Sequence, residues 1–380
     1  MSLPACVRYL RDYVAIPSVN PMRREDIPAE IVGERRYAEH LAGQLRGLGL
    51  DAELIGTGER ASVVAEATAA GATETVLIAS HLDTVPVDGM EIPPFEPTID
   101  GGRLHGRGSC DTKSGMAAAV AALEELIPSG RLRCNVVLVG EADEECSSIG
   151  IRDLFARLGT RRPDWAIATE PTEMRVVTHH KGIAQVRIAT HGVACHSSDP
   201  SAGRSAIIAA ARAVLSLDAL SRRLAERRDP RLGPPTLSVG LLSGGSAINI
   251  VPDHAVLSLD RRVLPGETER SIADEIGDAF TRDGIDDATL ESCSIEKPAL
   301  ATAEDHPAVR ACLAALARTG VRAATDVAAF ATDASILAEG GIPGVVLGPG
   351  WIGHAHTARE FVEVEQVELA TRFFVALLSR

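Results

Sequence analysis

The amino-acid sequence predicts an α/β protein with a mixed, mostly parallel sheet flanked by helices, and a second, α+β domain inserted into the first. Two observations carry this prediction. Four short apolar runs are continuous rather than alternating, which is typical of parallel strands buried on both faces. Segments in the middle of the chain instead alternate apolar and polar residues, as antiparallel strands with one solvated face do. The four continuous runs are residues 75–80, 135–140, 164–169 and 344–348.

Helical patterns connect these strands. Residues 114–126 are rich in helix formers and a proline follows them, which favours a helix that ends there. Residues 363–378 are expected to form the last helix. We therefore expect one domain from residues 1–178 and 296–380, and an inserted domain from residues 179–295. The strands and helices expected in the insert are residues 181–192, 204–217, 236–245, 254–264 and 268–282.

Composition limits the kinds of partner that the protein can have. The net charge is −14 at pH 7, which argues against nucleic acid and anionic membrane surfaces because both would repel an acidic protein. No apolar run reaches the length of a membrane span, and the first residues lack the apolar core of a secretory signal. The seven cysteines include no CxxC pair, so we expect free thiols and a cytoplasmic location.

Metal-capable side chains follow the continuous runs, at the edge of the predicted sheet where the strands end. In open α/β sheets ligands bind at this carboxyl edge, so side chains that are distant in sequence converge there. Asp111 adds an acid in a glycine-rich loop that precedes a helix. The side chains after the four runs are, in order, His81 and Asp83; Glu144 and Glu145; Glu170; and His354 and His356.

The stretch VVLVGEADEECSSIG, residues 136–150, places several acids directly after a buried strand. Buried carboxylates are costly unless cations offset them. Mixed imidazole and carboxylate ligands suit zinc, with cobalt or manganese as alternatives. With Asp111, Glu145 and Glu170 as ligands, two divalent ions would keep a positive centre that acidifies water. Glu144 would then act as a base, because neighbours in an extended segment point opposite ways.

Each of these residues alone has an ordinary structural explanation. A single acid after a strand is more often a solvated loop residue or a helix N-cap, and a lone histidine is more often structural. The repetition after every continuous run, together with the adjacent glutamate pair, favours the metal centre. Two other classes fit less well: a metal-binding protein without catalysis, which can lack the base or a ligand, and a nucleotide-binding protein, whose glycine-rich phosphate motifs are absent.

Seven motifs in order resemble a known family, and the likeness spans nearly the whole chain. They are SHLDTVP, GRGSCDTKSGMAA, EADEECSSIG, ATEPT, GGSAINIVP, DRRVLPG and VLGPG…HAHTAREFV. Together they resemble the zinc-dependent deacylases and exopeptidases that include acetylornithine deacetylase, succinyl-diaminopimelate desuccinylase, aminoacylase and glutamate carboxypeptidase. In the last motif the family's histidine matches His356 rather than His354. Cys146 and the segment CDTKSG depart from the usual pattern, but neither departure removes a ligand.

The resemblance implies a zinc-exopeptidase-like catalytic domain that holds two zinc ions. His81 and Glu170 would bind the first ion. Glu145 and His356 would bind the second, and Asp111 would bridge both.

The resemblance also implies the remaining catalytic roles. Asp83 would orient the ligand histidine, and Glu144 would be the general base and then the general acid. The inserted domain would be a dimerisation and lid domain, from which His196 crosses the dimer interface to steady the oxyanion. Asn249 and Arg262 would bind the substrate carboxylate.

The expected substrate is a small N-acyl amino acid. The motif VLGPG followed closely by Ala-His favours an acetylornithine deacetylase-like activity. The alternatives are a desuccinylase-like deacylase and a dipeptidase or carboxypeptidase of the same family. Asp333 is either an acid that meets a substrate amine or the N-cap of a helix.

Overall fold

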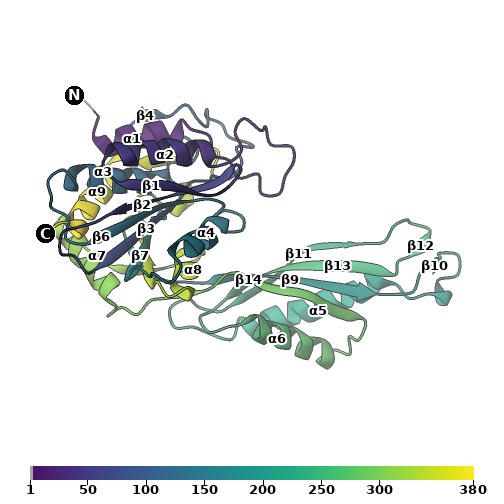
Figure 1. Ribbon diagram of the computed structural model, residues 1–380. Helices are drawn as coiled ribbons and strands as arrows, with labels where there is room; N and C mark the ends of the chain where they lie inside the picture. Colours follow the sequence, from purple (N-terminus) through teal and green to yellow (C-terminus); the bar gives the residue numbers. More distant parts are fainter. Residues whose placement is uncertain (1–2) are drawn as a thin grey trace. The chain divides into compact units, whose positions relative to one another are not determined.

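The computed structural model describes residues 3–380, which divide into two compact units (Figure 1). Unit 1 contains the residues up to Thr178, together with Thr302–Asp326 and Thr332–Arg380. Unit 2 contains His179–Ala301 and Val327–Ala331. The chain therefore returns to unit 1 at residue 302, where the sequence placed this return at residue 296.

A mixed sheet forms the centre of unit 1. Its strand order is β1-β2-β6-β3-β7-β17-β8-β15, with β16 paired to β8. The four continuous apolar runs form its adjacent strands β6, β3, β7 and β17, which pair in parallel. The neighbours β1, β2 and β8 are antiparallel to their partners. The strand bounds are β1 Asp51–Thr57, β2 Arg60–Ala67, β3 Thr75–His81, β6 Asn135–Glu141, β7 Trp165–Ala168, β8 Val176–His180, β15 Leu300–Ala301, β16 Thr325–Ala328 and β17 Gly344–Val346.

Helices cover both faces of this sheet, which explains why its central strands are apolar throughout. Val76 and Ile78 of β3 pack in a large core with α1, α2, α3, α7 and α9. Leu77 and Ala79, which alternate with them, pack in a second core with α4 and α8. The two groups of helices lie on opposite sides of the strands in Figure 1. The helix bounds are α1 Ala5–Val14, α2 Arg35–Gly47, α3 Lys113–Leu126, α4 Ile149–Leu158, α7 Pro307–Arg318, α8 Ala334–Glu339 and α9 Val364–Leu378.

A small antiparallel sheet contains chain segments that lie near Asp111 and His356 in the sequence. β18 pairs with β5, and β5 pairs with β4. β18 lies where an apolar strand pattern follows His356 in the sequence, whereas β4 and β5 were not predicted, because they are only three residues long. Their bounds are β4 Thr98–Asp100, β5 Arg103–His105 and β18 Phe361–Glu363.

Unit 2 is an antiparallel sheet with the strand order β11-β13-β9-β14, and α5 and α6 pack on one of its faces. Apolar residues that alternate along β9 and β13, such as Ile188 and Leu257, face these helices. A short ribbon of β10 and β12 belongs to the same unit. Among residues 3–380, no helix has the length and apolar character that crossing a membrane requires. The bounds are β9 Gly182–His191, β10 Cys195–His196, α5 Ala206–Leu224, β11 Thr236–Gly244, β12 Ile250–Val251, β13 His254–Val263, α6 Glu269–Arg282 and β14 Ala288–Lys297.

The close approach of α3 to β7 depends on Gly115. A Cβ atom added there would lie 2.3 Å from Thr169 Oγ1 and 2.8 Å from the Thr169 carbonyl oxygen. This approach matters for the site, because α3 follows Asp111 and Thr169 precedes Glu170.

We expect Gly115→Ala to lower the free energy of unfolding by about 1–3 kcal/mol, because the added methyl group overpacks a buried contact with backbone. The matched control is Gly43→Ala in α2, where nothing lies within 4 Å of an added Cβ. That change should instead stabilise the protein by about 0.4–1 kcal/mol. Thermal unfolding of both variants measures the difference, and equal midpoints would contradict the prediction.

Candidate metal centre

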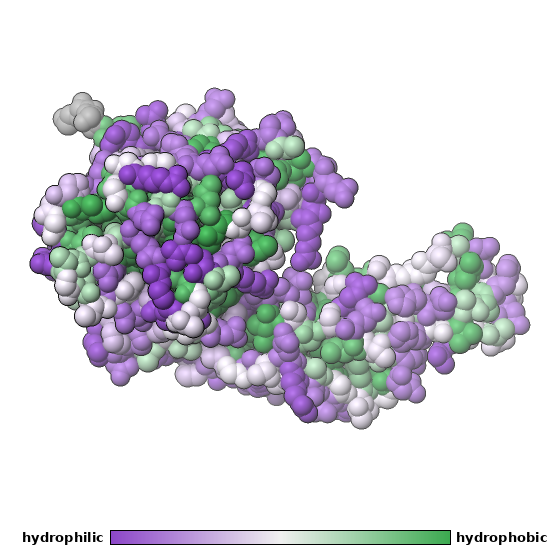
Figure 2. Space-filling model, in the orientation of Figure 1, coloured by the Kyte–Doolittle hydropathy of each residue, from purple (hydrophilic) through white to green (hydrophobic). Residues whose placement is uncertain are grey.

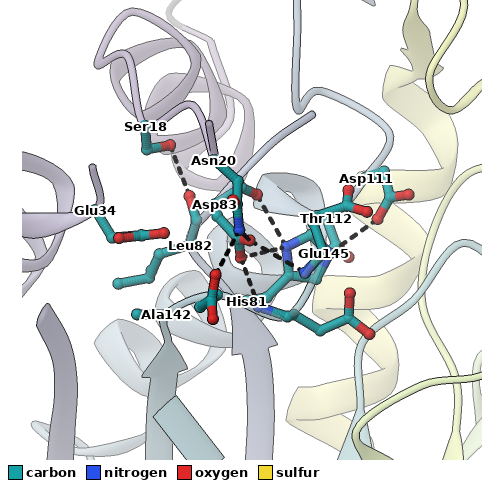
Figure 3. A network of polar contacts seen from close by, with 12 residues as sticks. Ser18, Asn20, Glu34, His81, Leu82, Asp83, Asp111, Thr112, Ala142 and Glu145 are labelled. Carbon is teal, nitrogen blue, oxygen red and sulfur yellow. Dashed lines mark hydrogen bonds and ion pairs between the residues drawn. The ribbon is translucent and has the colours of Figure 1, made fainter. Parts of the chain in front are cut away.

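The chain brings the predicted ligands together at the carboxyl edge of the parallel strands. His81 ends β3, Glu145 follows β6, and Glu170 follows β7. Asp111 precedes α3, and His356 lies in the loop between β17 and β18. Figure 3 shows His81 and Asp111 meeting in a network of polar contacts that also includes the Glu145 segment.

Asp111 lies between two imidazole rings. Its Oδ1 is 3.0 Å from His81 Nε2, and its Oδ2 is 3.2 Å from His356 Nε2. His356 Nε2 is also 2.9 Å from Glu145 Oε1, and His81 Nε2 is 3.8 Å from Glu170 Oε2. One carboxylate therefore joins two half-sites, each with one histidine and one glutamate.

The charges of this cluster favour the binding of cations. Burial alone would lower the pKa of His356, but its contacts with Asp111 and Glu145 raise that pKa to about 10. Burial also acts to lower the pKa of His81, but Glu170, Asp111 and Asp83 together raise that pKa well above its ordinary value. The same contacts lower the pKa of Asp111 although its burial acts to raise it. Protons on the two rings thus balance the acids, which is the balance that bound metal ions would provide.

The donor set fits divalent ions of the zinc type. Ligand atoms of His81, Asp111 and Glu145 all lie within 4.8 Å of one another, so the two half-sites are close enough to form one cluster around Asp111. Imidazole nitrogen and carboxylate oxygen are ordinary zinc donors, and cobalt and manganese accept the same types. His81 and Asp111 are buried, whereas the His356 side chain is 46% exposed, so the cluster opens to solvent on the His356 side.

Asp83 contacts the backbone of the glutamate pair more closely than it contacts the histidine ring. The N–H groups of Glu144 and Glu145 donate to its two carboxylate oxygens, each at 3.1 Å. His81 Nδ1 lies 2.9 Å from the Asp83 backbone carbonyl and 3.4 Å from Asp83 Oδ1. The residue therefore supports both half-sites without belonging to the ligand set.

The other acids of residues 136–150 lie in different surroundings from Glu145. Asp143 has a φ of 67° and accepts hydrogen bonds from Ser147 and Asn20, away from the two ligand histidines. Glu141 is the buried last residue of β6. Glu144 is also buried and adjoins ligand Glu145, with its backbone fixed by Asp83.

Glu360 was part of a recognised motif but had no predicted role. It is fully buried, and its Oε1 accepts hydrogen bonds from the N–H groups of Cys110, at 3.0 Å, and Asp111, at 3.1 Å. Arg107 donates to its other oxygen. No sequence signal other than its place after His356 would have identified this support of the Asp111 backbone.

His354 is occupied by aromatic packing instead of ligand contacts. Its ring centroid lies 3.9 Å from that of Phe361 and 4.9 Å from that of Trp351. Trp351 is about half exposed, and its carbonyl accepts a hydrogen bond from the thiol of Cys110. The structure thus places His356, and not His354, against Asp111.

Asp333 is buried and accepts a hydrogen bond of 2.6 Å from Ser148 Oγ. It stands at the N-cap of α8, but its side chain makes no capping hydrogen bond. The N-cap position predicted for Asp333 is therefore confirmed, and its side chain also links the starts of α4 and α8.

His196 and Asn249 are neighbours in unit 2, although 53 positions separate them. β10 and β12 pair His196 with Ile250, and the Ser197 N–H donates to the Asn249 carbonyl. Both residues are exposed. Arg262 lies near the other end of β13, eight residues or about 27 Å from the end next to this ribbon. Unit 2 therefore does not gather the three residues at one place.

An α/β scaffold with a two-part site for divalent cations agrees with the comparisons with known proteins. Residues 77–380 match the family described as Peptidase family M20/M25/M40. A peptidase M20 domain-containing protein of Schizosaccharomyces pombe is 32% identical over 77% of this chain, which spans 66% of that relative's length. An acetylornithine deacetylase of Proteus mirabilis is 30% identical, over 97% of this chain and 94% of its own.

Solved structures share the fold at lower sequence identity. A tripeptidase of Staphylococcus aureus aligns with a TM-score of 0.80 and 22% identity, over 98% of this chain and 97% of its own. A protein of Bacillus subtilis described as a dinuclear metal binding peptidase from the M20 family aligns with a TM-score of 0.73 and 15% identity, over 98% and 96%. The chain belongs to the peptidase family M20/M25/M40, which confirms the family resemblance, and it is a hydrolase that acts on amide bonds.

We expect zinc binding to the metal-free protein to release protons, because His81 and His356 must lose their protons before a ring nitrogen can bind an ion. The pKa of His356 is raised from 6.5 to about 10, so zinc affinity should rise with pH through that range. Titration calorimetry in buffers of different ionisation enthalpy measures the released protons.

The control for this measurement is the neighbouring histidine. His356→Ala should release fewer protons than the wild type, whereas His354→Ala should match it. A binding enthalpy that is the same in every buffer would show that the two ligand rings are not protonated.

Proposed function

We propose that this protein is a zinc-dependent deacylase that removes the acyl group of an N-acyl amino acid, with an acetylornithine deacetylase-like substrate. The observation that carries the proposal is the position of Asp111 between His81 and His356, beside the Glu144–Glu145 pair. Similarity to acetylornithine deacetylase over nearly the whole chain supports this choice of substrate.

Two zinc ions, held by the two half-sites, would supply positive charge that acidifies water and polarises the amide carbonyl. His81 and Glu170 would hold one ion, Glu145 and His356 the other, and Asp111 both. The metal-binding description of the Bacillus subtilis protein supports two ions, and cobalt or manganese would suit the same donors.

Glu144 takes the proton from the attacking water molecule and passes it to the leaving amine. Its place supports this role, because Asp83 fixes its backbone directly beside ligand Glu145. Amide hydrolysis needs one group that is first a base and then an acid, and a carboxylate beside the metal ligands meets this need.

His196 donates a hydrogen bond to the oxyanion that forms at the amide carbon. His196 Nδ1 contacts Ser198, at 3.1 Å from its N–H and 2.7 Å from its Oγ, so Nε2 is the ring nitrogen proposed to donate to the oxyanion. Asn249, adjacent in the same ribbon, and Arg262 bind the substrate carboxylate.

A homodimer would bring the ribbon of one copy to the metal centre of the other. β11 is an edge strand of unit 2, and its Leu241 and Leu242 are 70% and 49% exposed. An exposed apolar edge strand is a ready site for pairing with a second chain. Figure 2 shows further hydrophobic surface toward the end of unit 2 that carries β10 and β12, where Ile248 and Ile250 are exposed.

The runner-up activities are those of a succinyl-diaminopimelate desuccinylase-like deacylase and of a dipeptidase or carboxypeptidase. Turnover of N-acetyl, N-succinyl and N-formyl amino acids and of dipeptides, with added zinc or cobalt, separates these alternatives. The seven free thiols fit a reducing compartment, which supports a cytoplasmic location.

Replacing Glu144 by Gln should lower kcat on N-acetylornithine about 10²–10⁴-fold, because the amide side chain cannot accept a proton. Zinc content should remain at the wild-type level, because Glu144 is not a ligand. Glu173→Gln, which changes an exposed glutamate three residues after Glu170, is the matched control and should retain activity. Wild-type turnover by a metal-loaded Glu144→Gln variant would remove Glu144 from the mechanism.

Mixing two inactive variants tests whether the dimer shares its sites. His196→Ala and Glu144→Ala should each be inactive alone. Mixed dimers would contain one site with both defects and one intact site, so a 1:1 mixture should recover about one quarter of wild-type activity. Steady-state assay after refolding the mixture measures this recovery. If the mixture stays inactive although mixed dimers form, His196 does not act across an interface.

A further inference from the structure

The segment Ser18–Asn20 runs alongside the segment that carries Asp83. The Asn20 N–H donates to the Thr84 carbonyl at 2.8 Å, and the Thr84 N–H donates to the Ser18 carbonyl at 3.0 Å. Ser18 Oγ donates to the Leu82 carbonyl at 2.6 Å. Ser18 and Asn20 are fully buried. They lie outside the part of the chain that matches the family description, which begins at residue 77.

Each polar atom of the Asn20 side-chain amide contacts two groups. Its Nδ2 donates to Asp83 Oδ2 and to Asp143 Oδ1, both at 2.8 Å. Its Oδ1 accepts from the Met22 N–H at 2.9 Å and from an Arg60 guanidinium nitrogen at 3.1 Å. An amide has two N–H donors and one carbonyl oxygen with two lone pairs, so this set uses its full capacity. The two acids on one side and the two donors on the other fix which way the amide faces.

The groups behind Asn20 hold it in this orientation. Arg60, besides its contact with Asn20, forms ion pairs with buried Glu34 and with Asp143 Oδ1, the latter at 3.4 Å. Figure 3 shows Asn20 next to Asp83. Without the amide, the carboxylates of Asp83 and Asp143 would face each other directly.

The oxygen of Asp83 that Asn20 binds is the one that accepts the Glu145 N–H. The other oxygen accepts the Glu144 N–H. A rotation of the Asp83 carboxylate would therefore displace the base and a ligand of one half-site together. Such a rotation should move His81 less, because the closer contact of His81 is with the Asp83 backbone carbonyl.

We propose that Asn20 is a positioning residue, which sets the Glu144–Glu145 segment through Asp83 and thereby governs the half-site that contains Glu145 and His356. This inference rests on the proposed function only in its kinetic part. Its metal-binding part depends on the described contacts alone.

The test compares Asn20→Ala and Asn20→Asp with the wild type in the full-length protein. Asn20→Asp keeps the shape but puts a third carboxylate against Asp83 and Asp143, and Asn20→Ala removes the amide without adding charge. We expect one of two zinc-binding steps, that of the half-site with Glu145 and His356, to lose about 10–100-fold in affinity, as is usual when the support of a ligand is removed. The other step should keep its wild-type affinity. At saturating zinc, kcat should fall while KM stays at the wild-type value.

The matched control is Asn135→Asp, the same substitution at the opposite end of β6, where Asn135 accepts the Ala69 N–H. It should leave both zinc-binding steps unchanged. If Asn20→Asp does not fold, Asn20→Ala decides the outcome. Hydrogen exchange of the unmodified protein gives an independent measurement, because the Glu144 and Glu145 amides should exchange slowly even without metal.

The proposal would be overturned by wild-type zinc affinities and kcat in Asn20→Ala, or by rapid exchange of the Glu144 and Glu145 amides. A uniform loss of both zinc-binding steps would also overturn it, because that pattern indicates general destabilisation. If no N-acyl amino acid is hydrolysed but the zinc affinities respond as expected, the proposed function fails and the role of Asn20 stands.

Discussion

The mutual repulsion of buried carboxylates at one edge of a parallel sheet is the constraint on which the rest of this structure depends. Acids from four separate parts of the chain meet there, and they are tolerable only with positive charge among them. Asp111 is central to this charge balance, because each of its two oxygens contacts a different imidazole ring. The acids around the two rings raise the pKa of both His81 and His356 against the effect of burial, so the same negative charge would favour a bound cation.

Two further buried acids hold the ligands in place, and they do so in the same way. Asp83 accepts the N–H groups of Glu144 and Glu145, and Glu360 accepts those of Cys110 and Asp111. Each carboxylate thus fixes the backbone of a two-residue segment that supplies a ligand. A carboxylate that accepts backbone N–H groups compensates part of its own desolvation, so these acids need no metal ion themselves. The site is therefore built in two layers, with ligands in front and backbone-binding acids behind.

Much of the fold was predictable because burial on both faces leaves a clear trace in sequence. The four continuous apolar runs became the four adjacent parallel strands, and their ends brought His81 and Glu170 to one edge. The outer strands β1 and β2 were missed, since polar residues, including one glutamate in each strand, interrupt their apolar runs. The contacts of Asn20 and Glu360 were not predictable either. The contact of Asn20 with Asp83 joins residues 63 positions apart, and that of Glu360 with Asp111 joins residues 249 positions apart. Single polar residues carry no periodic signal that would reveal such contacts.

The loop that carries His356 also carries Trp351, and the only other tryptophan of the sequence, Trp165, is buried in β7 with its indole N–H bonded to Glu74. One indole is therefore enclosed in the main core, while the other is about half exposed and packs against His354, two residues before the predicted ligand His356. Intrinsic fluorescence excited at the indole band accordingly contains a constant contribution from the core and a variable one from the rim of the site. The protein has its own optical reporter for events at this loop, without any attached dye.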